Sequence, residues 1–120
     1  MISESDSDPA LEAASFERPA KIESIEITGR RWFQRGPGNT YHSVRIYVND
    51  SFVHMICFAY GYDQQYQQSA AEWLEANGYI ECEHYSNGSK ESLWRACDRL
   101  GIKYTSTVRD VPRKKDLTAL

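Results

Sequence analysis

Residues 41 to 58 read YHSVRIYVNDSFVHMICF, and this stretch decides the fold. In its first half every second residue from Val44 is aliphatic, which is the pattern of a strand with one buried face. Asn49-Asp50 is a turn signal, and a second run of β-forming residues follows it. The stretch therefore predicts two adjacent strands, 41–49 and 51–59. Because large apolar residues fall on both faces of the second strand, we expect it to be buried on both sides.

The residues before this stretch predict a further strand. From Lys21 to Gln34 the residue types alternate, and one face carries Ile25, Ile27 and Phe33. The run RGPGNT at 35–40 supplies the glycines, proline and asparagine that tight turns use. We therefore expect a hairpin here, and with the strands above a three-stranded antiparallel meander.

Beyond Gly61 the apolar residues recur at helical spacing. Asp63 is a typical N-cap and Asn77-Gly78 a typical helix end, so the pattern predicts a first helix between them. The next residues, 79–85, fit either a short edge strand or an irregular link. The turn signal Ser86-Asn87-Gly88 follows.

A second helix and a last strand complete the pattern. Ser89 is a candidate N-cap, with Glu91 in the first turn, and Gly101 ends the helix. Residues from Ile102 to Arg109 alternate again, which predicts a fourth strand.

These elements give the order β-β-β-α-α-β and an α+β fold, with two helices on one sheet face and a final strand that returns to the sheet. A chain of 120 residues suffices for one core and is too short for two domains. We therefore expect a single domain over 21–117. The residues expected in its core are Ile25, Ile27, Val44, Ile46, Val48, Trp73, Leu74, Leu93, Cys97 and Leu100.

Charge is unevenly distributed along the chain. Residues 1–20 contain five acidic side chains and one basic, whereas residues 21–120 contain 13 basic and 12 acidic. The first segment is rich in Ser and Asp, so we expect an acidic, disordered leader, either a solubilising segment or an arm that screens a basic patch. The other end is basic, which is typical both of a solvated terminus and of a phosphate-binding patch. Its basic residues are Arg109, Arg113, Lys114 and Lys115.

The chain shows no targeting or membrane segment. No apolar run approaches the roughly 20 residues that span a bilayer. The first residues lack the basic start and apolar stretch of a signal peptide. Three cysteines are too few for a disulfide framework. We therefore expect a cytoplasmic protein with reduced thiols and no membrane partner.

Several runs of the sequence resemble a small family of proteins that recurs in bacteriophage and prophage genomes. The runs are GRRWF (29–33), GNTYHSV (38–44), IYVN (46–49), FAYGY (58–62) with Gln65-Tyr66, SLWR (92–95) and DVPRKKDL (110–117). The resemblance covers residues 21–117. Members of that family are hypothetical proteins without an assigned activity. The resemblance therefore implies a phage-borne accessory protein and carries over no site residues.

The strongest candidate binding surface combines arginines with aromatic side chains around the first hairpin. Its residues are Arg30, Arg31, Trp32, Arg35, Tyr41, Arg45 and Tyr47. Guanidinium groups neutralise phosphates and aromatic rings stack on bases, as in sheets that bind single-stranded nucleic acid. The same residue types are enriched at the centres of protein interfaces. A third interpretation is cross-strand packing, in which Trp32 covers Tyr47.

The sequence offers no catalytic or metal-binding motif. His42 and His54 lie on neighbouring predicted strands, and Cys82 stands two residues before His84. A zinc site, however, needs about four ligands at paired spacings, and no C-x-x-C or H-x-x-x-H pair occurs. We therefore expect no metal, no cofactor and no enzymatic activity, with an uncharacterised small enzyme as the remaining alternative.

These observations predict a non-enzymatic protein that binds a host macromolecule. A host protein is the expected partner, such as a component of a defence or nucleic-acid-processing complex, because 13 basic and 12 acidic residues leave the body almost neutral. The alternative is a module that binds single-stranded nucleic acid on the Arg and aromatic sheet face. The oligomeric state is open, and a homodimer is one alternative.

Overall fold

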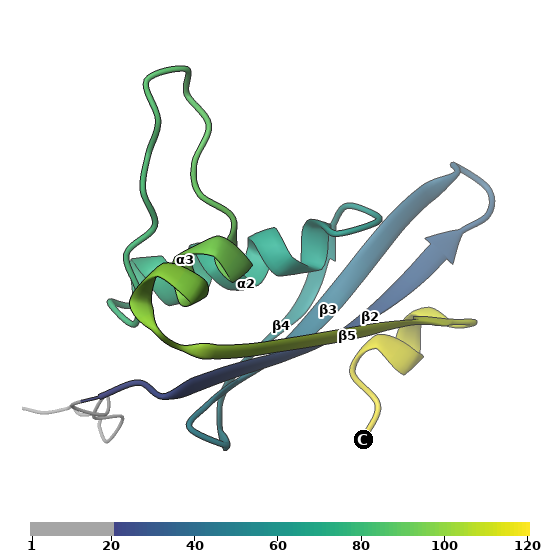
Figure 1. The fold of residues 1–120 in the computed structure, drawn as a ribbon. Coiled ribbons are helices and arrows are strands. Elements are labelled where there is room, and N and C mark those ends of the chain that lie inside the picture. The colour runs from purple at the N-terminus through teal and green to yellow at the C-terminus, as the bar shows by residue number, and fades with distance from the viewer. Residues whose placement is uncertain (1–20) are drawn as a thin grey trace, which may run out of the picture.

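The computed structural model describes residues 21–120, so the predicted leader over 1–20 lies outside the described residues. The chain is an α+β fold, and the predicted order of three strands, two helices and a strand is confirmed (Figure 1). The elements are β2 (Ser24–Gln34), β3 (Asn39–Val48), β4 (Ser51–Tyr60), α2 (Gln65–Ala76), α3 (Leu93–Leu100), β5 (Lys103–Val111) and the 3-10 helix η1 (Lys114–Leu117).

The four described strands form one mixed sheet in the order β4-β3-β2-β5. β3 pairs antiparallel with both β2 and β4, so the predicted meander is present. β5 pairs parallel with β2, which makes the sheet mixed. The long helical connection between β4 and β5 makes this parallel pairing possible, because a strand joined by a tight turn can pair only antiparallel with its neighbour. β4 and β5 are therefore the two edges.

The core lies between one sheet face and the two helices, which Figure 1 shows on the same side of the sheet. Ile25, Ile27, Val44, Ile46 and Val48 point into it from the sheet, and Leu74, Leu93 and Cys97 from the helices. Gly29 lets α2 approach closely, because a Cβ atom there would lie 2.6 Å from the ring of Tyr66. We call this helix-packed side the covered face and the opposite side the outer face.

Two expectations about burial are wrong. The strand β4 is not buried on both sides, because it forms an edge of the described sheet and neither α2 nor α3 covers the outer face. Phe52 and Phe58 are 55% and 46% exposed. Leu100 is exposed at the end of α3, one turn beyond the point where that helix contacts the core. Trp73 is only partly buried, and its ring stacks on His54 and Tyr79 at the core margin.

Both helices begin later than the sequence predicts. Asp63 adopts a φ of 57°, and the N-cap of α2 is Gln64. The N-cap of α3 is Ser92 rather than Ser89. Glu91 precedes that helix and is buried against Arg99, whose guanidinium lies 2.7 Å from a carboxylate oxygen.

The segment 79–92 is an arm that projects from the helix layer (Figure 1). It is the irregular link of the two predicted alternatives, since its only bridge joins His84 and Lys90. Those two side chains both contact the carboxylate of Glu75, which ties the arm to α2. No helix in the described part of the chain is long and apolar enough to cross a membrane.

Candidate functional site

The sheet separates the predicted binding residues onto two surfaces. Alternate residues of a strand point to opposite faces, so Arg30 and Trp32 lie on the outer face and Arg31 on the covered face. The outer face also holds Tyr41, Arg45 and Tyr47, which stand opposite outward residues of β2 in the antiparallel register. Arg35 lies in the turn after β2. The seven residues are therefore not one patch.

Four aromatic rings form a row across the outer face. Trp32 stacks on Tyr41 with ring centroids 5.9 Å apart, and Tyr41 stacks on Phe58 at 4.6 Å. Tyr60 meets Tyr41 edge to face at 5.6 Å. We call Trp32, Tyr41, Phe58 and Tyr60 the aromatic row. Sequence reasoning included the first two and missed the last two, because β4 was expected to be buried.

The aromatic row ends at the edge strand β4. Its ten residues, SFVHMICFAY, contain no Asp, Glu, Lys or Arg. No described strand pairs with its outer edge. Tyr60 and Phe58 are 65% and 46% exposed there, and Phe52, farther along the strand, meets Tyr47 edge to face. Natural edge strands are usually protected by charges or proline, so a long uncharged edge is a site of association.

Three arginines gather on the outer face beside the aromatic row. Arg30 of β2 and Arg109 of β5 are directly paired in the register, and Arg45 of β3 lies opposite Thr28, one outward position away. We call Arg30, Arg45 and Arg109 the arginine cluster. Burial and the charges of the other two guanidinium groups lower the pKa of Arg30.

The C-terminal segment, residues 113–120, covers part of this face. Leu117 is buried, and its carbonyl oxygen accepts a 2.6 Å hydrogen bond from Ser43 Oγ. Arg30 donates to the carbonyl oxygens of Asp116 and Ala119, and Arg45 donates to that of Ala119. Part of the outer face is therefore covered by the protein's own C-terminal segment, which the sequence did not indicate.

The predicted C-terminal basic patch is divided among different contacts. Arg113 binds the carboxylate of Asp116, and Lys114 lies 4.9 Å from the centre of the Phe58 ring. Lys115 is exposed, and Arg109 belongs to the arginine cluster. The patch thus contributes to the outer face through two residues, Arg109 and Lys114.

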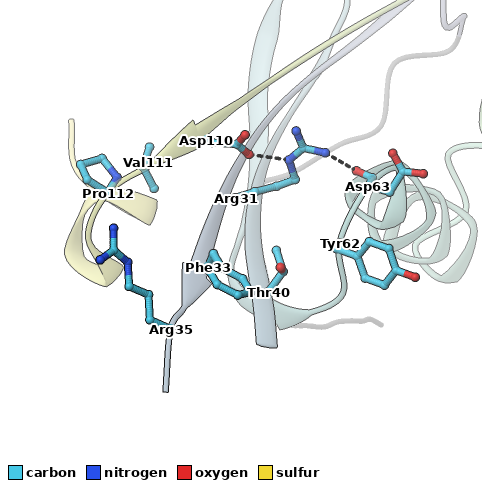
Figure 2. Close-up of a pocket in the computed structure, with 9 residues that line it drawn as sticks. All are labelled: Arg31, Phe33, Arg35, Thr40, Tyr62, Asp63, Asp110, Val111 and Pro112. Carbon is cyan, nitrogen blue, oxygen red and sulfur yellow. Dashed lines mark hydrogen bonds and ion pairs between the residues drawn. The ribbon is translucent and has the colours of Figure 1, made fainter. Parts of the chain in front are cut away.

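A cavity of about 660 Å³ lies at the end of the sheet near the first hairpin (Figure 2). Arg31 is held there by Asp110 at 2.8 Å and by the carbonyl oxygen of Asp63 at 3.1 Å. Phe33 was predicted on the same strand face as Ile25 and Ile27, but it is 56% exposed because the hairpin extends beyond the helices. The other residues that line the cavity are Arg35, Thr40, Tyr62, Val111 and Pro112. Two arginines and two aspartates line this cavity, so neither sign of charge dominates it.

The histidines are engaged in packing. His42 is buried, with Nδ1 3.0 Å from the carbonyl oxygen of Gly61 and Nε2 2.8 Å from Ser69 Oγ. Since a carbonyl only accepts, Nδ1 carries the proton and Nε2 accepts from the serine. Burial lowers the pKa of His42 and also that of His54. The two do not meet, because His42 opposes Ala59 in the sheet and His54 opposes Ile46, four residues along.

The thiols and the remaining histidine offer no reactive pair. Burial raises the pKa of Cys97 to about 12 and also raises that of Cys82, so both stay protonated near neutral pH. Cys82 is buried, whereas His84 points to Glu75 with 3.0 Å between Nε2 and the carboxylate. Among residues 21–120 no three His, Cys, Asp or Glu side chains are grouped as metal ligands.

Comparison with known protein families, with curated proteins and with solved structures found no match to this chain.

Proposed function

We propose that this protein is a non-enzymatic phage accessory protein that acts in the cytoplasm of the bacterial host by binding a host protein. The binding surface is the edge strand β4 together with the aromatic row. The carrying observation is the uncharged edge of β4, which presents Phe58 and Tyr60 to solvent. The phage origin is supported by the sequence resemblance alone.

The edge supports a protein partner for two reasons. Its free N–H and C=O groups can pair with an extended segment of another chain, which supplies affinity without regard to sequence. The exposed rings beside it supply specificity, because aromatic residues in desolvated pockets contribute most of the binding energy of protein interfaces. Tyr41 stacks on Phe58, and Trp32 stacks on Tyr41, so the exposed rings are held in place by neighbouring rings of the same face.

The chemistry of the described residues favours binding over catalysis. His42 has both ring nitrogens in hydrogen bonds, and the ring of His54 stacks on Trp73 with centroids 4.4 Å apart. A general base needs a free nitrogen within reach of a substrate proton. His42 has no such free nitrogen in this arrangement.

Capture from bacterial lysate with the full chain as bait tests the proposal. The wild type is expected to retain a stoichiometric partner, and Tyr60→Ser and Cys57→Lys are expected to weaken its binding about thirtyfold or more, by losing an anchor ring and by placing a charge on the edge. Trp94→Ser is the matched control, because Trp94 is a half-exposed aromatic residue of α3 on the other layer.

Three outcomes would contradict the proposal. Absence of a stoichiometric partner together with turnover in a broad substrate screen would favour an enzyme. An equal loss of binding in Trp94→Ser would place the interface elsewhere. Self-association of the purified chain that Cys57→Lys abolishes would assign the edge to a second copy of this chain.

A second candidate is single-stranded nucleic acid, and the distribution of charge favours it. Residues 64–101, which form the helix layer and arm, contain six acidic and three basic side chains. The remaining described residues contain ten basic and six acidic, and the arginine cluster lies among them. A gel shift at about 50 and 200 mM salt separates the candidates, because binding to several phosphates weakens steeply over this range. A salt-sensitive shift that Arg109→Gln weakens would favour nucleic acid over a protein.

A further inference from the structure

Three guanidinium groups converge on one cavity of the outer face, with a volume of about 430 Å³. Arg30 and Arg109 are direct neighbours across β2 and β5, and Arg45 approaches from β3. Three residues with hydroxyl groups, Thr28, Tyr47 and Thr107, also line the cavity. The lining residues besides the arginine cluster are Thr28, Gly29, Tyr47, Thr107, Val108 and Leu120. The cavity is thus rich in hydrogen-bond donors.

The positive charge of this cavity is not balanced by ion pairs. None of the ion pairs among the described residues includes a member of the arginine cluster. The carboxylate of Asp116 acts on Arg30 from a distance, but its oxygens are bound to Arg113. Three like charges at neighbouring positions of a sheet repel one another, so a bound anion would stabilise the arrangement.

Two of the three guanidinium groups, those of Arg30 and Arg45, donate hydrogen bonds to uncharged carbonyl oxygens of the C-terminal segment. The carbonyl oxygen of Ala119 lies 2.6 Å from Arg30 and 2.9 Å from Arg45, in the place where an oxyanion would be shared by two guanidinium groups. A phosphate oxyanion adds a full negative charge and can accept bidentate hydrogen bonds from guanidinium groups, neither of which a carbonyl oxygen provides. Residues 118–120 are exposed, so they can move away from the arginines without opening the core, while Leu117 stays buried against the sheet.

We propose that the arginine cluster is a binding site for a single phosphate group, and that residues 118–120 occupy part of it until phosphate displaces them. The compact arrangement around one cavity suits one phosphate, whereas a nucleic-acid backbone requires donors spread along a path. This inference rests on the proposed function in one respect: the phosphate is carried on a phosphorylated side chain of the protein partner.

Calorimetric titration of the full chain with inorganic phosphate and with N-acetyl-phosphoserine amide tests the site, and both are expected to bind saturably. Arg109→Gln is expected to weaken both about tenfold or more, since a charge-assisted contact is lost. The side chain of Arg109 makes no hydrogen bond among the described residues, and its loss relieves repulsion from Arg30, so this variant should unfold at the wild-type midpoint or above it. Arg95→Gln is the matched control, because Arg95 is an exposed arginine of α3 that lies over the ring of Trp94.

Amide resonances of the wild-type chain test the displacement. Adding phosphate is expected to shift the signals of residues 118–120, and the same addition to Arg109→Gln is expected to shift them far less. Saturable binding with no change at 118–120 would refute the displaceable cover.

Other outcomes overturn the site itself. Absence of saturable binding of either probe would do so, and so would an equal loss in Arg95→Gln. An oligonucleotide that binds about a hundredfold more tightly than phosphoserine would assign the cluster to a nucleic-acid backbone. The proposed function fails separately. Tyr60→Ser is expected to leave phosphate binding intact, so a Tyr60→Ser variant that also keeps wild-type affinity for the protein partner would refute the edge of β4 and leave the phosphate site standing.

Discussion

The two faces of the sheet are built from the same strands and have opposite compositions. The covered face is aliphatic and almost fully buried, as at Ile27 and Ile46. The outer face carries aromatic rings and guanidinium groups, and a short C-terminal segment covers only part of it. Within one strand, the residues that point to the covered face thus stabilise the fold, and the alternating residues that point to the outer face form a binding surface. Substitutions one residue apart should therefore have different effects.

The largest contrast is expected between Ile27 and its neighbour Thr28. Ile27→Ala leaves a cavity in the closed core and should lower the free energy of unfolding by about 2–5 kcal/mol. Thr28→Ala removes a half-exposed hydroxyl from the outer face and should change it by at most about 0.5 kcal/mol. Urea unfolding measures both. Equal effects would mean that the outer face is as tightly packed as the core.

A smaller effect is expected at Gly29, where α2 rests on the sheet. Gly29→Ala places a methyl group 2.6 Å from the Tyr66 ring, and this overpacking should cost about 1–3 kcal/mol of unfolding free energy. Gly36→Ala, in the hairpin turn, is the control because no atom lies within 4 Å of the added carbon. Thermal unfolding of both variants checks the difference. A neutral Gly29→Ala would show that the ring can move away.

Acid should affect the covered face before the outer face. Burial lowers the pKa of His42 and His54 in the folded chain, so the unfolded chain binds protons more readily. The free energy of unfolding is therefore not reduced by the histidines above the unfolded histidine pKa of about 6.5, and it decreases as the pH falls below that value. The arginines of the outer face do not titrate in this range.

Urea midpoints at pH 7.5, 6.5 and 5.5 measure this decline. His54→Phe keeps a ring against Trp73 and is expected to reduce the dependence on pH. A midpoint that rises toward pH 5.5 would contradict the direction of both histidine shifts.

The smallest effect is expected from deleting residues 1–18. Their composition is too polar to bury much apolar area, so the urea midpoint should stay unchanged. A decrease of several kcal/mol in unfolding free energy would show that this segment belongs to the domain.

Local sequence patterns predicted the helices and strands, but they did not predict the order of the strands in the sheet. Alternation identified Val44 and Ile46 as core residues, because one residue in two must face the helices. The same rule places Arg30 and Arg31 on opposite faces, so alternation alone separates Arg31 from the outward residues of the candidate surface. The edge position of β4 depends on which strand β5 joins, and that pairing spans residues far apart in the chain.

The contact of the C-terminal segment with the outer face was also not predictable. Its polar bonds go to backbone oxygens of Asp116, Leu117 and Ala119, which every residue type possesses. The sequence therefore contains no side-chain motif that predicts this contact. Similarly, Ser89 and Asp63 are good capping residues by type, but the projecting arm and the turn before α2 take those positions out of the helices.

Docking through carbonyl oxygens has a consequence for how this segment can evolve. The side chain of Ala119 takes no part in the bonds that hold the chain end, so substitutions there leave the docking intact. Only Leu117 must stay apolar, because its side chain is buried against the sheet. The segment can thus drift in sequence and acquire new charges or modification sites while it keeps its position over the arginines.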